Sequence, residues 1–80
     1  MTAPRLLLVE DDPALAELLE FRFKAEGYAV TVTPDGDEAL LLAQEEAPDL
    51  VLLDWMVEGT SGIEVCRRLR ASAQPMRIVM

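Results

Sequence analysis

The fold is decided by the stretch Leu6-Leu7-Leu8-Val9-Glu10-Asp11-Asp12, in which four aliphatic residues run directly into three acidic ones. Consecutive Leu and Val residues without polar alternation are typical of a strand buried on both faces, as in a parallel sheet covered by helices. A second aliphatic run, Leu50-Val51-Leu52-Leu53, ends in Asp54. Neighbouring parallel strands end at the same edge of a sheet, where ligands bind in open α/β folds. We therefore expect the acidic ends of both runs to converge into a metal and phosphoryl site.

The first predicted helix runs from Pro13 to about Glu26. Asp12 is placed to cap it, a proline suits the first helical position, and Gly27 suits the residue after the last turn. The segment from Tyr28 to Thr33 alternates and predicts a strand. The residues that recur at helical spacing and predict the buried face of this helix are Leu15, Leu18, Leu19 and Phe23.

The remaining elements continue the same alternation. Asp35-Gly36-Asp37-Glu38 predicts a turn and the start of a second helix, with a capping box at its first and last residues, and Pro48 ends that helix. Residues 49–54 then predict a strand, residues 58–62 a loop, and residues 77–80 the opening of a fourth strand. The apolar stripes of the second and third helices are Ala39, Leu40, Ala43 and Ala47, and then Ile63, Cys66 and Leu69 before an end near Ser72. The order βαβαβαβ predicts an α/β fold with a parallel sheet and right-handed crossovers.

Composition and charge exclude several classes of function. The 80 residues are 51% apolar and 28% charged, which is typical of a globular chain, although a short one for an α/β fold. The single cysteine, Cys66, excludes an internal disulfide and a zinc site built from several cysteines, and it fits an inert core thiol in the cytoplasm. No segment predicts a signal peptide or a membrane span. The net charge of −8 argues against direct contact with nucleic acid, so any DNA role needs another domain.

Four segments together resemble the receiver domain of two-component response regulators, and the match spans the whole chain in register. They are Val9-Glu10-Asp11-Asp12, Asp35-Gly36-Asp37-Glu38-Ala39, Pro48-Asp49-Leu50-Val51-Leu52-Leu53-Asp54 and Gly59-Thr60-Ser61-Gly62. Asp54-Trp55-Met56 resembles the branch that controls the phosphate regulon and carries a winged-helix DNA-binding domain. The resemblance implies a flavodoxin-like, three-layer, doubly wound parallel sheet with strand order 2-1-3-4-5. Residues 1–80 would then be an incomplete receiver domain without strand 5 and the last two helices.

The resemblance also implies a chemistry for the acidic strand ends. Asp54 would attack the phosphorus of a phosphohistidine on a sensor histidine kinase and become an acyl phosphate. Asp11 and Asp54 would bind Mg²⁺ directly, the backbone carbonyl of Met56 would be a third ligand, and Glu10 would act through a water. Mg²⁺ prefers hard oxygen ligands, and a cation favours attack of one anion on another. Without the cation, the crowded carboxylates should repel one another and raise at least one pKa.

The implied partners follow from the same resemblance. The chain would be a stoichiometric phosphoacceptor rather than an enzyme, with the sensor kinase as its protein partner and no membrane partner. The parent protein would control transcription through an effector domain that is absent here, and it would dimerise through the missing last helices. The family's hydroxyl residue, expected just after Met80, and its strand-5 lysine are also missing, so this chain should accept phosphate weakly and not signal. Glu58 stands where the family usually has Pro, which predicts a looser loop or a less stable acyl phosphate.

Alternative interpretations remain for single residues and for the whole chain. Asp12 fits a helix cap better than a metal ligand, and Asp35 and Glu38 fit capping roles. Trp55 and Met56 fit the mouth of the site better than the core. A metal-dependent phosphohydrolase would also place acids at strand ends, but such families usually have a second acid where this chain has Met56. A pseudo-receiver that acts only as a docking module would lose the site acids, and this chain retains them.

Overall fold

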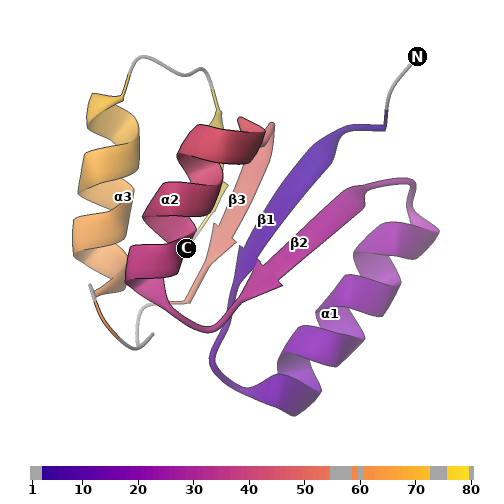
Figure 1. Cartoon of the computed structure of the whole chain (residues 1–80). Helices are drawn as coiled ribbons and strands as arrows, with labels where there is room; N and C mark the ends of the chain where they lie inside the picture. Colours follow the sequence, from indigo (N-terminus) through magenta and orange to yellow (C-terminus); the bar gives the residue numbers. More distant parts are fainter. Residues whose placement is uncertain (1–2, 55–58, 60, 73–75, 80) are drawn as a thin grey trace.

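The computed structural model describes residues 3–54, 59, 61–72 and 76–79. Four strands alternate with three helices (Figure 1). The strands are β1 (Arg5–Val9), β2 (Ala29–Thr33), β3 (Leu50–Leu53) and β4 (Arg77–Val79), and the helices are α1 (Pro13–Ala25), α2 (Gly36–Glu46) and α3 (Gly62–Ala71). Trp55, Met56 and Glu58 lie outside the described residues, so the expectations for them stay predictions.

The four strands form one parallel sheet in the order β2-β1-β3-β4. β1 is central, because Leu6 pairs with Val30 on one side and with Leu50 on the other. This arrangement confirms the predicted parallel sheet and its strand order for the four strands described. It also brings the ends of β1 and β3 to the same edge of the sheet.

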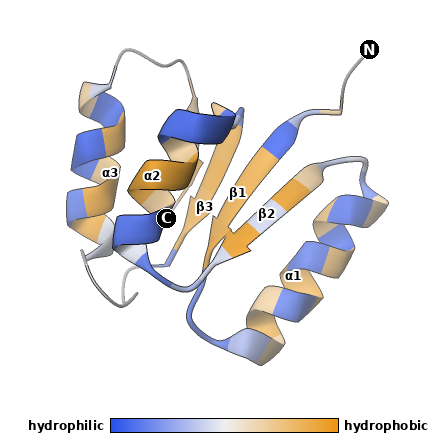
Figure 2. Ribbon diagram, viewed as in Figure 1, coloured by the Kyte–Doolittle hydropathy of each residue, from blue (hydrophilic) through white to orange (hydrophobic). Residues whose placement is uncertain are grey.

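The core lies on both faces of the sheet, because successive side chains of a strand point to opposite faces. Figure 2 shows that the strands are mostly apolar and that the helices mix hydrophilic and hydrophobic residues. α2 and α3 pack on one face and α1 on the other. The buried residues of the first face are Leu7, Val9, Ala39, Ala43, Val51, Leu53, Val65 and Leu69. Those of the second face are Leu6, Leu8 and Ala16.

Two aspartates cap the first two helices. Asp12 Oδ1 accepts hydrogen bonds from the Ala14 and Leu15 amides at 3.0 and 3.2 Å, which confirms its predicted capping role. Asp35 Oδ1 accepts from the amides of Asp37 and Glu38 at 2.7 and 3.4 Å. The Asp35 amide donates to the Thr33 hydroxyl at 3.2 Å, so this hydroxyl takes the place that the predicted capping box gave to Glu38.

The predicted buried face of α1 is wrong at two positions. Leu15 and Leu18 are 42% and 57% exposed. Ala16 is buried instead, and Leu19 and Phe23 pack beside it against the sheet. The periodicity of an amphipathic helix defines a stripe, but the sheet covers only part of a stripe this wide.

The stripes of the other two helices also need correction at their ends. Ile63 is 59% exposed, because α3 buries Gly62, Val65 and Leu69. Ala47 is exposed and lies just past α2, where it adopts a left-handed conformation with φ 46° as the C-cap residue. Within the described part of the chain, α1 to α3 are each too short or too polar to cross a membrane.

Candidate metal centre

The site begins where two neighbouring strands end. Glu10 and Asp11 follow β1, and Asp54 follows β3. The pairing of Val9 with Leu53 is the last in the β1–β3 register, so Glu10 and Asp54 leave the sheet at equivalent points. The Asp54 amide donates to the Val9 carbonyl at 3.0 Å, which extends the ladder by one bond into the site.

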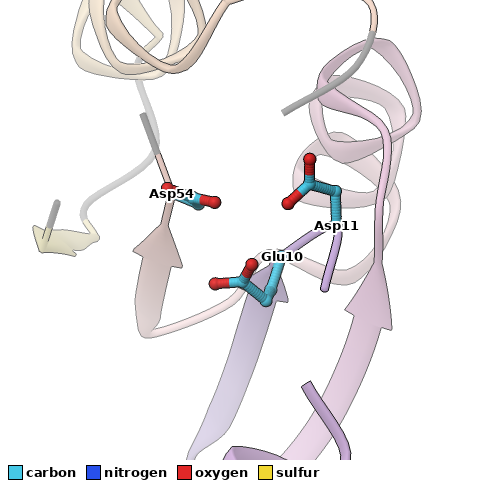
Figure 3. A group of neighbouring side chains, drawn as sticks. All are labelled: Glu10, Asp11 and Asp54. Carbon is cyan, nitrogen blue, oxygen red and sulfur yellow. The ribbon is translucent and has the colours of Figure 1, made fainter. Parts of the chain in front are cut away.

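Three carboxylates converge at this edge, as the aliphatic runs predict. Each of Glu10, Asp11 and Asp54 offers one oxygen, and these oxygens lie within 4.8 Å of one another. Figure 3 shows Asp11 and Glu10 at the end of β1 and Asp54 at the end of β3, with their carboxylate groups around a common space. Glu10 and Asp54 are half-buried, and Asp11 is exposed to solvent. Three hard oxygen donors at this spacing fit a cation such as Mg²⁺ and leave room for further ligands.

The electrostatics of the cluster agree with its crowding. Partial burial raises the pKa of Glu10 above its ordinary value. The negative charge of Asp54 and hydrogen bonds with Asp54 and Asp11 raise it further, because they favour the protonated form. The Asp12 amide donates to Glu10 Oε2 at 3.1 Å and acts in the opposite direction, but the net pKa is still raised. A bound cation would favour the charged form of this carboxylate.

The structure separates the predicted site residues by role. Asp12 follows Asp11 directly but caps α1 and lies outside the group of three carboxylates. Met56 lies outside the described residues, so its carbonyl ligand stays a prediction. Apolar residues from β1, β3, β4 and α1 surround a cavity of about 320 Å³ that opens beside Glu10 and Asp54.

The sequence interpretation did not identify Thr33 as a residue that supports the site through hydrogen bonds. Its side chain is fully buried, its carbonyl accepts from the Glu10 amide at 3.0 Å, and its hydroxyl accepts from the Asp35 amide. Thr33 thus joins the acidic strand end to the start of α2. A hydroxyl residue two positions before a capping aspartate was the available signal, because Thr readily bonds a nearby backbone amide.

Two transcriptional regulators resemble this chain in sequence, and the pattern of the response regulator receiver domain family matches residues 6–80. The phosphate regulon transcriptional regulatory protein PhoB of Rhizobium meliloti is 48% identical over 75 residues, which are 94% of this chain and 33% of that protein. The DNA-binding response regulator MtrA of Mycolicibacterium smegmatis is 51% identical over 69 residues, which are 86% of this chain and 30% of that protein. The chain therefore spans about a third of the length of these curated relatives.

Solved structures show the same arrangement of strands and helices. The response regulator TrrA of Thermotoga maritima, in complex with Mg(2+)-BeF, has a TM-score of 0.90 and 35% identity, with 96% of this chain and 67% of that chain covered. The BeF3-activated receiver domain of Klebsiella pneumoniae RstA has a TM-score of 0.84 and 39% identity, with 92% and 64% covered. The likeness therefore includes both the fold and the sequence.

Proposed function

Because this chain belongs to the response regulator receiver domain family, we propose that Asp54 accepts a phosphoryl group from the phosphohistidine of a sensor histidine kinase. The observation that carries this proposal is the convergence of the Glu10, Asp11 and Asp54 oxygens within 4.8 Å at the carboxyl edge of the sheet. Asp54 is the one member of the three that comes from β3, and its half-buried position leaves it reachable from solvent. It therefore faces the other two acids across the site.

In this proposal Asp11, Asp54 and the backbone carbonyl of Met56 would hold Mg²⁺ directly, while Glu10 would act through a water. The hard carboxylate oxygens of the three acids suit this ion, and TrrA, which is similar to this chain, was solved with Mg(2+)-BeF. When bound, the ion neutralises charge on the carboxylates and on the phosphoryl oxygens. Burial first, and then the neighbouring acids, raise the pKa of Glu10, and a bound cation would oppose that rise.

The transfer itself is a displacement at phosphorus. An Asp54 oxygen forms the new P–O bond while the P–N bond to the kinase histidine breaks, and the nitrogen retains that electron pair. The products are an aspartyl phosphate and a free histidine. Asp54 must be ionised to attack, and Asp11 and Glu10 keep the surrounding space polar and shaped for a cation. The chain supplies the nucleophile and its orientation, so each molecule takes up one phosphoryl group.

Receiver domains of response regulators are phosphoacceptors and are generally not enzymes. We extend the proposal to a longer protein in the cytoplasm, in which residues 1–80 are part of the receiver. An effector domain outside this chain would bind DNA and control transcription, and the parent would dimerise through further receiver helices. The support is the identity with PhoB and MtrA, whose names describe transcriptional and DNA-binding regulators and of which this chain spans about a third.

The test is to incubate the protein with Mg²⁺ and a small-molecule phosphodonor and to measure its intact mass. We expect one added phosphoryl group, and no addition to the Asp54→Asn variant. Addition to Asp54→Asn would show that another residue is the nucleophile. Many turnovers of a generic phosphate ester per protein molecule would instead favour a metal-dependent phosphohydrolase. Neither mass addition nor turnover would favour a docking module.

A further inference from the structure

Two glycines with positive φ differ in their surroundings. Gly27 has φ 98° and no atom within 4 Å of the position that a Cβ would take. Gly59 has φ 77°, and a Cβ there would lie 2.7 Å from both Asp35 Oδ1 and Asp37 Oδ2. Such a distance is too short for any non-bonded carbon and oxygen. The backbone at Gly59 therefore lies directly against the carboxylates of the first turn of α2.

The Asp35 carboxylate has little freedom to move away from Gly59. Its Oδ1 is the atom that caps α2, with hydrogen bonds from the Asp37 and Glu38 amides. The Asp35 amide is tied to the buried Thr33 hydroxyl. A side chain at position 59 would thus have to displace a helix cap or shift its own backbone.

This contact is connected to the metal centre from two directions. Thr33 accepts from the Glu10 amide, so hydrogen bonds lead from Glu10 through Thr33 to Asp35. Gly59 is five residues after Asp54 in the chain. The start of α2 therefore contacts Gly59, and through Thr33 it also holds the strand end that carries Glu10.

We infer that Gly59 is a positioning residue for the metal centre, acting through its close contact with Asp35 and Asp37. The inference rests on the proposed function, since the centre it positions is the Mg²⁺ site at Asp11 and Asp54. Through Asp35 and Thr33 the contact supports the strand end that carries Glu10 and Asp11, opposite Asp54. Glycine is needed for the lack of a side chain as well as for its φ.

The experiment measures the affinity for Mg²⁺ alone by calorimetry, together with the thermal midpoint, in the protein and its variants. We expect Gly59→Ala to weaken Mg²⁺ binding by about 10-fold or more, the effect seen when the support of a metal ligand is lost. Gly27→Ala is the matched control. It also imposes a positive φ on alanine, 98° instead of 77°, but in open space, so it should lower the thermal midpoint and leave the Mg²⁺ affinity unchanged.

A rescue variant separates the contact from backbone strain. Adding Asp37→Ala to Gly59→Ala removes one of the two crowding oxygens while Asp35 Oδ1 and the φ problem remain, so part of the Mg²⁺ affinity should return. Wild-type affinity in Gly59→Ala, equal losses in Gly59→Ala and Gly27→Ala, or no recovery in the double variant would each overturn the inference.

A second route covers the case in which Gly59→Ala does not fold. Thr33→Val removes the hydroxyl that holds the Asp35 amide and retains the shape of the side chain. Weaker Mg²⁺ binding in the folded Thr33→Val variant supports the inference, and unchanged binding overturns it. Failure of the wild-type protein to bind Mg²⁺ or to be phosphorylated would be a different result, because it contradicts the proposed function itself.

Discussion

The two edges of the sheet use the same acidic residue types in opposite ways. At the carboxyl edge, Glu10, Asp11 and Asp54 are brought together with their oxygens within 4.8 Å. At the amino edge, Asp49 Oδ2 accepts from the Arg5 amide at 2.8 Å. The Arg5 guanidinium donates to the backbone carbonyl of Glu46, the last residue of α2, at 2.9 Å. The carboxyl edge brings three negative charges together, whereas the amino edge provides Asp49 with a backbone hydrogen-bond donor from β1.

This difference distinguishes a metal-binding site from a structural hydrogen bond. A carboxylate that accepts a backbone amide stabilises the fold as it stands. Carboxylates that face one another destabilise the fold until a cation or a proton arrives, and the charge of Asp54 adds to burial in raising the pKa of Glu10. Substitutions at the carboxyl edge should therefore act mainly on ion binding, and substitutions at the amino edge should act on stability alone.

The largest effect should follow substitution of the exposed acid of the site. Asp11→Asn should weaken Mg²⁺ binding by more than about 100-fold, since loss of a direct ligand should exceed the loss seen for supporting residues. Calorimetric titration with Mg²⁺ measures it. Asp12→Ser is the matched control at the neighbouring position, because serine can still cap α1. This variant should bind Mg²⁺ like the wild type. Equal losses in both variants would show that general acidity, rather than the three carboxylates, holds the ion.

A smaller effect is expected at the amino edge. Asp49→Ala removes the acceptor of the Arg5 amide and should lower the free energy of unfolding by about 1 kcal/mol. Chemical denaturation measures this change, and Asp49→Asn, which retains a carbonyl oxygen, should lose less. Mg²⁺ affinity should be unaffected in both. A loss of Mg²⁺ binding comparable to that of Asp11→Asn would remove the distinction between the edges.

The smallest effect concerns Glu10 and pH in the absence of Mg²⁺. The pKa of Glu10 is higher in the folded state than in the unfolded chain. Its favourable contribution to the free energy of unfolding is therefore complete at any pH below the pKa of the unfolded chain. That contribution is lost as the pH rises through the higher folded value. Glu10→Gln should thus be more stable than the wild type at neutral pH, and the difference should vanish in acid.

Denaturation curves at neutral and acidic pH measure this difference. Mg²⁺ should reduce the advantage of Glu10→Gln at neutral pH, because the ion favours the charged carboxylate of the wild type. An advantage that is independent of both pH and Mg²⁺ would assign the effect to packing rather than charge.

The sequence predicted the parallel sheet, its order over four strands, and the meeting of the acids at one edge. The sheet and the meeting of the acids depend on local patterns, because aliphatic runs indicate buried strands and parallel strands end together, whereas the strand order came from the family resemblance. The capping role of Asp12 was predictable for the same reason. The identity of the Met56 carbonyl as a ligand stays a prediction.

The failures depend on packing between distant segments. The exposed Leu18 and Ile63 show that helical spacing identifies an apolar stripe without telling which part of it the sheet covers. The contact of Gly59 with Asp35 joins residues far apart in the sequence, and neither residue's local pattern indicates the other. Thr33 was assigned only to a strand, although its hydroxyl also supports the start of α2.

The central place of β1 has a kinetic consequence. β1 is synthesised before both of its neighbours, and its pairing with β3 joins Leu6 to Leu50. Contacts between segments so far apart form slowly, because the long intervening chain must first be ordered. The aliphatic run of β1 is therefore the part of the nascent chain with the longest exposure to chaperones and to aggregation. Since Asp54 meets Glu10 through this same pairing, the chain becomes competent to bind the ion only after β1 and β3 have paired.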